Sequence, residues 1–269
     1  MIRLSFIVDK SFILQHILKS FSDWRSVKVL KHKLWKRNQK LYYILAQNIE
    51  PLTFADNFSE ELKRAVKDSL SDLSFIYKNP LFRKILKETE KYRLFVNEQW
   101  EKNYNLSLMH MRDITKLPLD TVQLNLEVYI SHPKLSRGRS YPEQRVIAWA
   151  HSEDWKNYST VYLWHEIMHH IAYSRKGSSH LMHALIELAC DNELRVRLNG
   201  RGGYFREGEF DVGHNYLVKL ERKITEEWKK YLNDPRTNVY QLERKLRSKF
   251  SEEFLVSRQS ALNEWAEWH

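Results

Sequence analysis

The stretch TVYLWHEIMHHIAYSRKGSSH, from Thr160 to His180, gathers four histidines and a glutamate in one short segment. Its apolar residues recur with a helical period and no proline interrupts them, so we expect a helix from about Asn157 to Arg175. His165 and His169 are four residues apart, so both rings can reach one ion from the same helix face. Glu166 then points about 100° around the helix, beside such an ion. The segment predicts either a metal-binding catalytic helix or an amphipathic helix that happens to carry histidines.

The motif His165-Glu166-x-x-His169 resembles the HExxH signature of the zincin metallopeptidases. The resemblance implies a peptidase with one Zn²⁺ ion as cofactor and a peptide or protein as substrate. In such an enzyme zinc activates a water molecule, and Glu166 would act as the general base. The resemblance covers about fifty residues, Arg145 to Arg195, so cleavage specificity stays open.

Zinc needs a third protein ligand, and the segment HALIELACDNELR, from His183 to Arg195, follows the motif. It is similar to the gluzincin subgroup of zincins, in which a glutamate on a following helix completes the site and an acid lies one turn later. That resemblance implies Glu187 as the third ligand and Asp191 as the acceptor of the Nδ1 proton of His165. The residues alone leave other ligands open: His180, His183, Asp191 and Glu193.

The hydrophobic period changes near Asp120. Alternating, β-rich residues predict strands near 122–131 and 145–151, joined by a loop over 132–144. By the same resemblance, the second strand is an edge strand that binds extended substrate in a groove. The residues expected to line that groove are Ala148, Trp149 and Ala150.

Glycines are concentrated after the expected third ligand. Five of the seven lie between Gly200 and Gly213, which predicts a loop whose backbone can approach a ligand closely. Similar enzymes place a Tyr or His after the third ligand to stabilise the oxyanion, which implies catalytic roles for Tyr204 and His214. Gly200 would close a helix from Ser179 to Leu198.

The helical period of the apolar residues predicts a mainly helical N-terminal region over residues 1–118. Helix-start signals at Asn57 and at Asn79 with Pro80 support this prediction. Residues 119–269 would form the zincin-like metallopeptidase core with C-terminal helices, unless the whole chain is one continuous domain. The expected fold class is α+β and predominantly helical, with a zincin-like core whose small sheet packs on the motif helix, plus long N- and C-terminal helices.

The net charge of +10 is concentrated in a basic segment over residues 25–40, within a stretch from Trp24 to Ile49 that contains no acid. Such a segment could bind nucleic acid, or it could be a solvated helix face above a buried apolar stripe. The alternative function is therefore a basic, nucleic-acid-associated protein with a structural or inactive metal site. A third reading is a helical scaffold without metal. The stripe in question is Val27, Leu30, Leu34, Leu41, Ile44 and Leu45.

The single cysteine, Cys190, excludes an internal disulfide and favours a reducing, cytoplasmic setting. We expect its side chain to be a buried small hydrophobe. Asp9 and Lys10 interrupt the apolar N-terminal run, which makes it too short for a signal peptide. No uncharged run approaches the ~20 residues of a membrane span, so we expect none.

Overall fold

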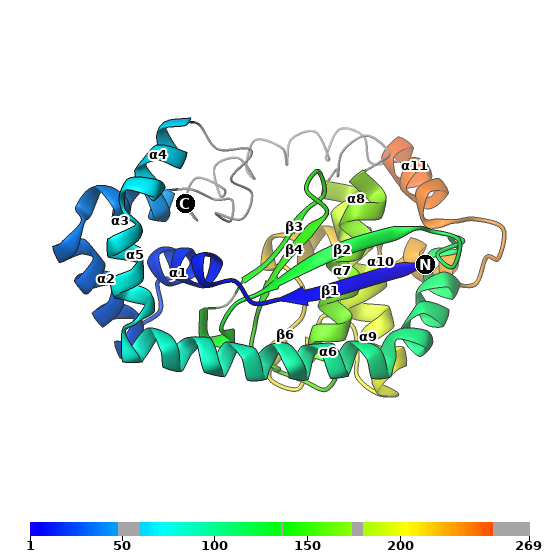
Figure 1. Cartoon of the computed structure of the whole chain (residues 1–269). Helices are drawn as coiled ribbons and strands as arrows, with labels where there is room; N and C mark the ends of the chain where they lie inside the picture. The colour runs from blue at the N-terminus through cyan, green and yellow to red at the C-terminus, as the bar shows by residue number, and fades with distance from the viewer. Residues whose placement is uncertain (48–59, 136, 174–179, 250–269) are drawn as a thin grey trace. The chain divides into compact units, whose positions relative to one another are not determined.

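The computed structural model describes residues 1–47, 60–135, 137–173 and 180–249 (Figure 1). These residues form two compact units. Unit 1 comprises Met1–Arg3, Gln99–Leu124 and the described part of Glu153–His269, and unit 2 comprises Leu4–Glu98 and Asn125–Ser152. Each unit therefore draws on residues from both sides of position 118. The helix start expected at Asn57 lies outside the described residues.

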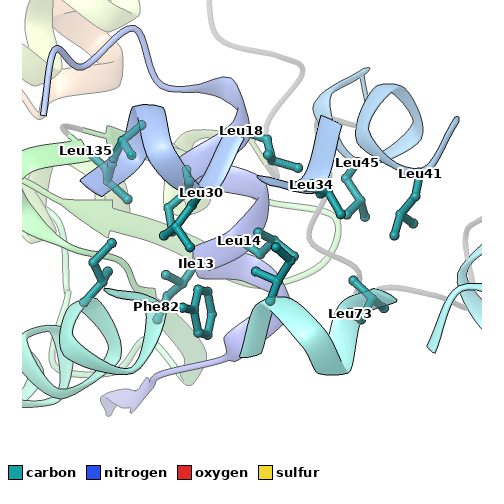
Figure 2. Close-up of a cluster of buried hydrophobic side chains, with 14 residues drawn as sticks. Ile13, Leu14, Leu18, Leu30, Leu34, Leu41, Leu45, Leu73, Phe82 and Leu135 are labelled. Atoms are coloured by element: carbon teal, nitrogen blue, oxygen red, sulfur yellow. The ribbon is translucent and has the colours of Figure 1, made fainter. Parts of the chain in front are cut away.

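The described residues of unit 2 form the helices α1 (Lys10–Lys19), α2 (Arg25–Arg37), α3 (Gln39–Gln47), α4 (Glu60–Asp68) and α5 (Leu70–Tyr77), followed by the first part of a longer helix that starts at Pro80. Apolar side chains of α1, α2, α3 and α5 meet in the hydrophobic cluster of Figure 2, which includes Leu14 and Leu30 and also Phe82 from the longer helix. Such burial removes apolar surface from water and is the main source of stability. The stripe expected beneath the basic segment is part of this core, except for the half-buried Ile44. A nucleic-acid partner stays a prediction.

Four strands form one small mixed sheet: β1 (Ile2–Ile7), β2 (Leu124–Ile130), β3 (Arg137–Tyr141) and β4 (Val146–Ala150). Their order is β1-β2-β4-β3, with β2 parallel and β3 antiparallel to β4. The strands expected near 122–131 and 145–151 are confirmed as β2 and β4. The expected loop over 132–144 is wrong in part, because it contains a short 3-10 turn, η2 (Pro133–Leu135), and β3. Strand β3 is polar and gains its hydrogen bonds from β4, so no alternating apolar pattern announces it.

Strand β4 does not lie at an edge of the sheet. Its two sides are paired with β2 and β3, so its backbone groups are already used and a peptide cannot add beside it. The edge position implied by the resemblance is therefore wrong. Ala148, Trp149 and Ala150 are all buried, with at most 2% of their surface exposed, and Ala148 packs in a cluster with Phe12. That these three side chains line a substrate groove stays a prediction, but the substrate would not pair with the backbone of β4.

The long helix α6 (Pro80–Thr115) begins in unit 2 and ends in unit 1. The start expected at Asn79 is confirmed, since its side-chain oxygen accepts a hydrogen bond from the N–H of Leu81 at 3.0 Å. Unit 1 continues with the elements that carry the expected metal site. They are α7 (Tyr158–Tyr173), α8 (His180–Glu187), the π-helical segment η3 (Leu188–Leu194), α9 (Arg195–Asn199), the short strands β5 (Arg206–Glu207) and β6 (Phe210–Asp211), α10 (Asn215–Leu232) and α11 (Val239–Lys249).

The helical run from α8 through η3 to α9 ends where the sequence predicts. Gly200 follows Asn199 with a φ of 67°, the left-handed conformation that glycine adopts without strain. Ser179, the expected start, lies outside the described residues. The whole described chain is thus mostly helical with a small mixed sheet. Within these residues, none of the helices is both long and apolar enough to cross a membrane.

Candidate metal centre

The motif helix α7 is held in place by polar contacts to the second half of α6. The N–H of Thr160 donates to the side-chain oxygen of Gln99 at 2.8 Å, and the indole N–H of Trp164 donates to Ser107 at 2.7 Å. Trp164 and Ser107 are fully buried. Because these contacts fix the rotation of α7 about its axis, they also fix the direction in which its histidines point.

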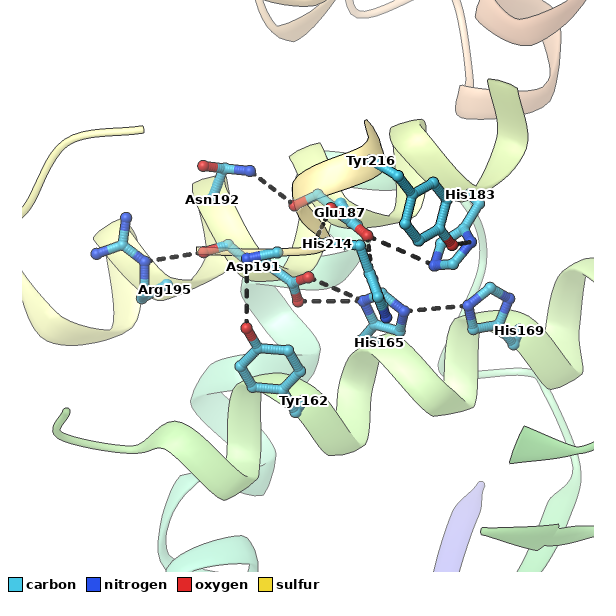
Figure 3. Close-up of polar contacts among 11 residues, drawn as sticks. Tyr162, His165, His169, His183, Glu187, Asp191, Asn192, Arg195, His214 and Tyr216 are labelled. Carbon is cyan, nitrogen blue, oxygen red and sulfur yellow. Dashed lines mark hydrogen bonds and ion pairs between the residues drawn. The ribbon is translucent and has the colours of Figure 1, made fainter. Parts of the chain in front are cut away.

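His165 and His169 direct the same ring nitrogen toward one point, as Figure 3 shows. Their Nε2 atoms are 3.0 Å apart. On the other side of His165, the Nδ1 atom lies 3.0 Å and 3.2 Å from the two carboxylate oxygens of Asp191. When Nδ1 of His165 donates its proton to Asp191, the lone pair of His165 lies on Nε2. Burial lowers the pKa of both histidines, so both rings are neutral near pH 7 and able to bind a metal.

Glu187 ends α8 and lies wholly inside the protein. Its Oε2 accepts a hydrogen bond from the backbone N–H of His214 at 2.9 Å. Its Oε1 pairs with Nδ1 of His214 and lies 3.5 Å from Nε2 of His183. Burial raises the pKa of Glu187 to about 8. The carboxylate is thus oriented toward histidines from two different elements.

The π-helical segment η3 connects Glu187 to Asp191. In a π-helix the hydrogen bonds reach one residue further than in an α-helix, and such segments are frequent at functional sites. Here the side-chain amide of Asn192 donates to the carbonyl of Glu187 at 3.2 Å, and Nε of Arg195 donates to the carbonyl of Asp191 at 2.8 Å. These contacts satisfy carbonyl groups in the segment and help to fix both acids.

His183 and His214 extend the group beyond the two motif histidines. One nitrogen each from His165, His183 and His214 lies within 4.8 Å of the others, a spacing compatible with metal binding. Nε2 of His183 is buried and makes no hydrogen bond, whereas its Nδ1 lies 3.3 Å from the hydroxyl of Tyr216. We call His165, His169, His183 and His214 the histidine cluster.

Gly213 brings the loop before α10 against Glu187. Its φ is +80°, and a Cβ atom at this position would overlap Oε2 of Glu187. Glycine is therefore required here both for its backbone conformation and for the close approach. At this residue the glycine-rich loop brings its backbone close to the Glu187 side chain, and its approach to a bound ligand stays a prediction. His214 follows as the N-cap of α10, and its N–H, which the helix does not use, binds Glu187.

Glu221 is a further buried carboxyl group that the sequence analysis missed. It is fully buried, and its carboxyl group lies within hydrogen-bonding reach of the carboxyl group of Glu187. Burial first, and then this neighbour, raise the pKa of Glu221 to about 11. A sequence signal exists, because an acid interrupts the buried stripe of α10. The stripe consists of Leu217, Glu221, Ile224, Trp228 and Tyr231.

Three other residues that the sequence analysis considered for the site make their contacts elsewhere. Tyr204 donates its hydroxyl hydrogen to Glu193 and accepts one from Trp228 at 3.0 Å, so this hydroxyl is already engaged away from the histidine cluster. Glu193 also accepts a hydrogen bond from Arg197 at 2.6 Å. His180 is half-buried, with its ring centroid 6.3 Å from that of Tyr216. The structure therefore does not bring Tyr204, Glu193 or His180 into the group around Glu187.

Glu166 is buried, with 7% of its surface exposed. Cys190 is buried and unpaired, as expected from the sequence. Burial first, then the charges of Asp191 and Glu166, raise the pKa of the Cys190 thiol well above its usual value. This thiol is therefore not a nucleophile near neutral pH.

Comparison of the chain with protein-family models, curated proteins and solved structures found no match. The case for a metal therefore rests on the donor set. Neutral imidazoles, a buried carboxylate and the buried Nε2 of His183 without a hydrogen bond are the groups that a divalent ion such as zinc prefers. These residues fit a metal ion.

Proposed function

We propose that this chain is a zinc-dependent peptidase, with His165, His169 and Glu187 as the metal ligands. The observation that carries the proposal is the 3.0 Å separation of the two Nε2 atoms, with Asp191 against the opposite nitrogen of His165. A carboxylate behind a ligand histidine fixes its tautomer and strengthens its binding to metal. A proton shared by the two nitrogens is the competing explanation, and metal analysis separates the two.

When bound, zinc lowers the pKa of a water molecule to about 7 and polarises a carbonyl group. The general base would be Glu166, which follows the first ligand directly in the sequence. It accepts the proton of the attacking water and returns it to the leaving amine. Its burial limits competition from bulk solvent for that proton.

We assign stabilisation of the oxyanion to Tyr216 in place of Tyr204. The hydroxyl of Tyr216 reaches the histidine cluster through His183, and 47% of the residue's surface is exposed to an incoming substrate. The hydroxyl of Tyr204 is engaged with Glu193. The ring of His214 contacts Glu187, so His214 either orients this ligand or binds a metal ion itself.

The test is the variant Glu166→Gln, assayed for zinc content and for hydrolysis of an unfolded protein such as casein. Removing a general base lowers the rate by about 10²- to 10⁴-fold. We expect zinc content equal to that of the wild type with hydrolysis reduced by this factor. Glu226→Gln is the matched control, since this side chain is 79% exposed on α10. Equal activity of Glu166→Gln and the wild type would rule out the mechanism.

A further inference from the structure

The histidine cluster offers more donors than one catalytic zinc ion uses. Catalytic zinc takes three protein ligands and keeps one position open. After His165, His169 and Glu187 are assigned to that ion, His183 and His214 remain, with ring centroids 5.0 Å apart. Both contact Oε1 of Glu187.

The number of buried carboxyl groups also indicates a further cation. Four carboxyl groups of unit 1 are buried: Glu166, Glu187, Asp191 and Glu221. Arg195 is the single buried arginine or lysine among the described residues, and it forms an ion pair with Glu207. Buried charges without a partner are strongly unfavourable. Ionisation of both Glu187 and Glu221 would place two negative charges side by side in the interior, and a divalent ion bound by both carboxylates would balance them.

Two buried side chains in this region, His183 and Glu221, have polar atoms without an ordinary hydrogen-bond partner, and a cation would explain both. Nε2 of His183 faces Glu187 without a hydrogen bond, and the carboxyl of Glu221 has only the neighbouring carboxyl of Glu187 to share a hydrogen bond with. Buried polar atoms in native proteins normally have a partner, so each such atom requires an explanation. An ion held by these groups would satisfy them together.

We propose that His183, His214 and Glu221 bind a second divalent cation, with the carboxylate of Glu187 shared between the two ions. The first ion rests on the proposed function, and the second adds to it. Imidazole and carboxylate donors suit zinc, and paired ions about 3.5–4 Å apart occur in several classes of hydrolase. The site belongs to that dinuclear class.

The test is metal stoichiometry. The purified chain is stripped with a chelator, loaded with excess zinc, desalted and analysed by mass spectrometry of the elements. We expect two zinc ions per wild-type chain and one in Glu221→Gln and in His183→Ala. The matched control, Glu226→Gln on the same helix, should keep two.

Glutamine has the shape of a protonated glutamic acid, so Glu221→Gln separates a ligand from a carboxyl that merely keeps a proton. One ion in both the wild type and Glu221→Gln would overturn the second site and leave the proposed function intact. No ion in the wild type would overturn both. Two ions in Glu221→Gln would show that Glu221 is not a ligand. The wild-type value decides the number of ions even if a variant fails to fold.

Discussion

At the scale of single residues, Glu187 and Asp191 have different expected contributions to metal binding. Glu187 is proposed as a direct ligand, whereas Asp191 contacts the far nitrogen of His165 at 3.0 Å. Loss of a carboxylate behind a ligand histidine typically weakens metal binding by about 10- to 100-fold. We expect Asp191→Asn to fall in this range and Glu187→Ala to lose more. Competition with a calibrated zinc chelator measures both affinities, and the reverse order would mean that Asp191 is the direct ligand.

The motif residues could be found from the sequence because the spacing of a helix fixes which side chains share a face. The pairing of Asp191 with His165, a prediction from resemblance, corresponds to the short contact in the structure. His183 could only be kept as one of several alternatives, since its approach to Glu187 depends on the relative packing of helices. Tyr216 and Glu221 were missed for the same reason. The acid within the apolar stripe of α10 was the one available signal.

At the scale of elements, the loop before α10 positions Glu187 through Gly213. We expect Gly213→Ala to destabilise the protein, because alanine at positive φ costs about 1 kcal/mol or more and its Cβ would also displace the Glu187 carboxylate. Zinc affinity should fall by at least about tenfold, as for other changes that disturb a ligand's support. Thermal unfolding and zinc titration measure the two effects.

Gly208→Ala is the matched control for this prediction. Gly208 also has a positive φ, of 59°, but a Cβ there would meet no atom within 4 Å. The Gly208→Ala variant should therefore lose stability for the same backbone reason and bind zinc as tightly as the wild type. If both variants bound zinc as tightly as the wild type, the contact between Gly213 and Glu187 would have no role in the site.

Local patterns also explain which elements were predicted. Helix α7 and strands β2 and β4 carry clear periods of apolar residues, and the sequence indicates them within a few positions. Strand β3 depends on pairing with β4, and its polar sequence with Gly138 carries no such period. The π-helical form of η3 depends on the packing around Glu187 and Asp191, which local propensity does not encode.

At the scale of the whole molecule, the buried acids predict how the stability of the metal-free protein depends on pH. The pKa of Glu187 rises from 4.5 to about 8, and that of Glu221 to about 11. A raised carboxyl pKa contributes stability that is complete below the ordinary value and is lost as pH rises through the raised one. Burial lowers the pKa values of His165, His169 and His183 in the folded protein. These histidines therefore reduce the stability of the fold as the pH falls below about 6.5, the pKa of histidine in an unfolded chain.

Above pH 7 the buried carboxyl groups therefore determine how the stability of the metal-free protein changes with pH. In the presence of a chelator, the urea midpoint of unfolding should fall between pH 7 and pH 9, and saturating zinc should reduce this fall because the ion favours the ionised carboxylates. Glu221→Gln should lessen the fall in the chelated protein. A midpoint that is constant or rises over this range would contradict the account.

We propose that the histidines and carboxylates of unit 1 bind a divalent metal. Metal analysis of the purified chain tests it most directly, on wild type and His165→Ala, both as isolated and after zinc loading. We predict bound zinc in the wild type and a marked loss in His165→Ala, with a circular dichroism spectrum that shows retained helix. A wild-type chain that takes up no zinc, or a variant that binds as much as the wild type, would contradict the claim.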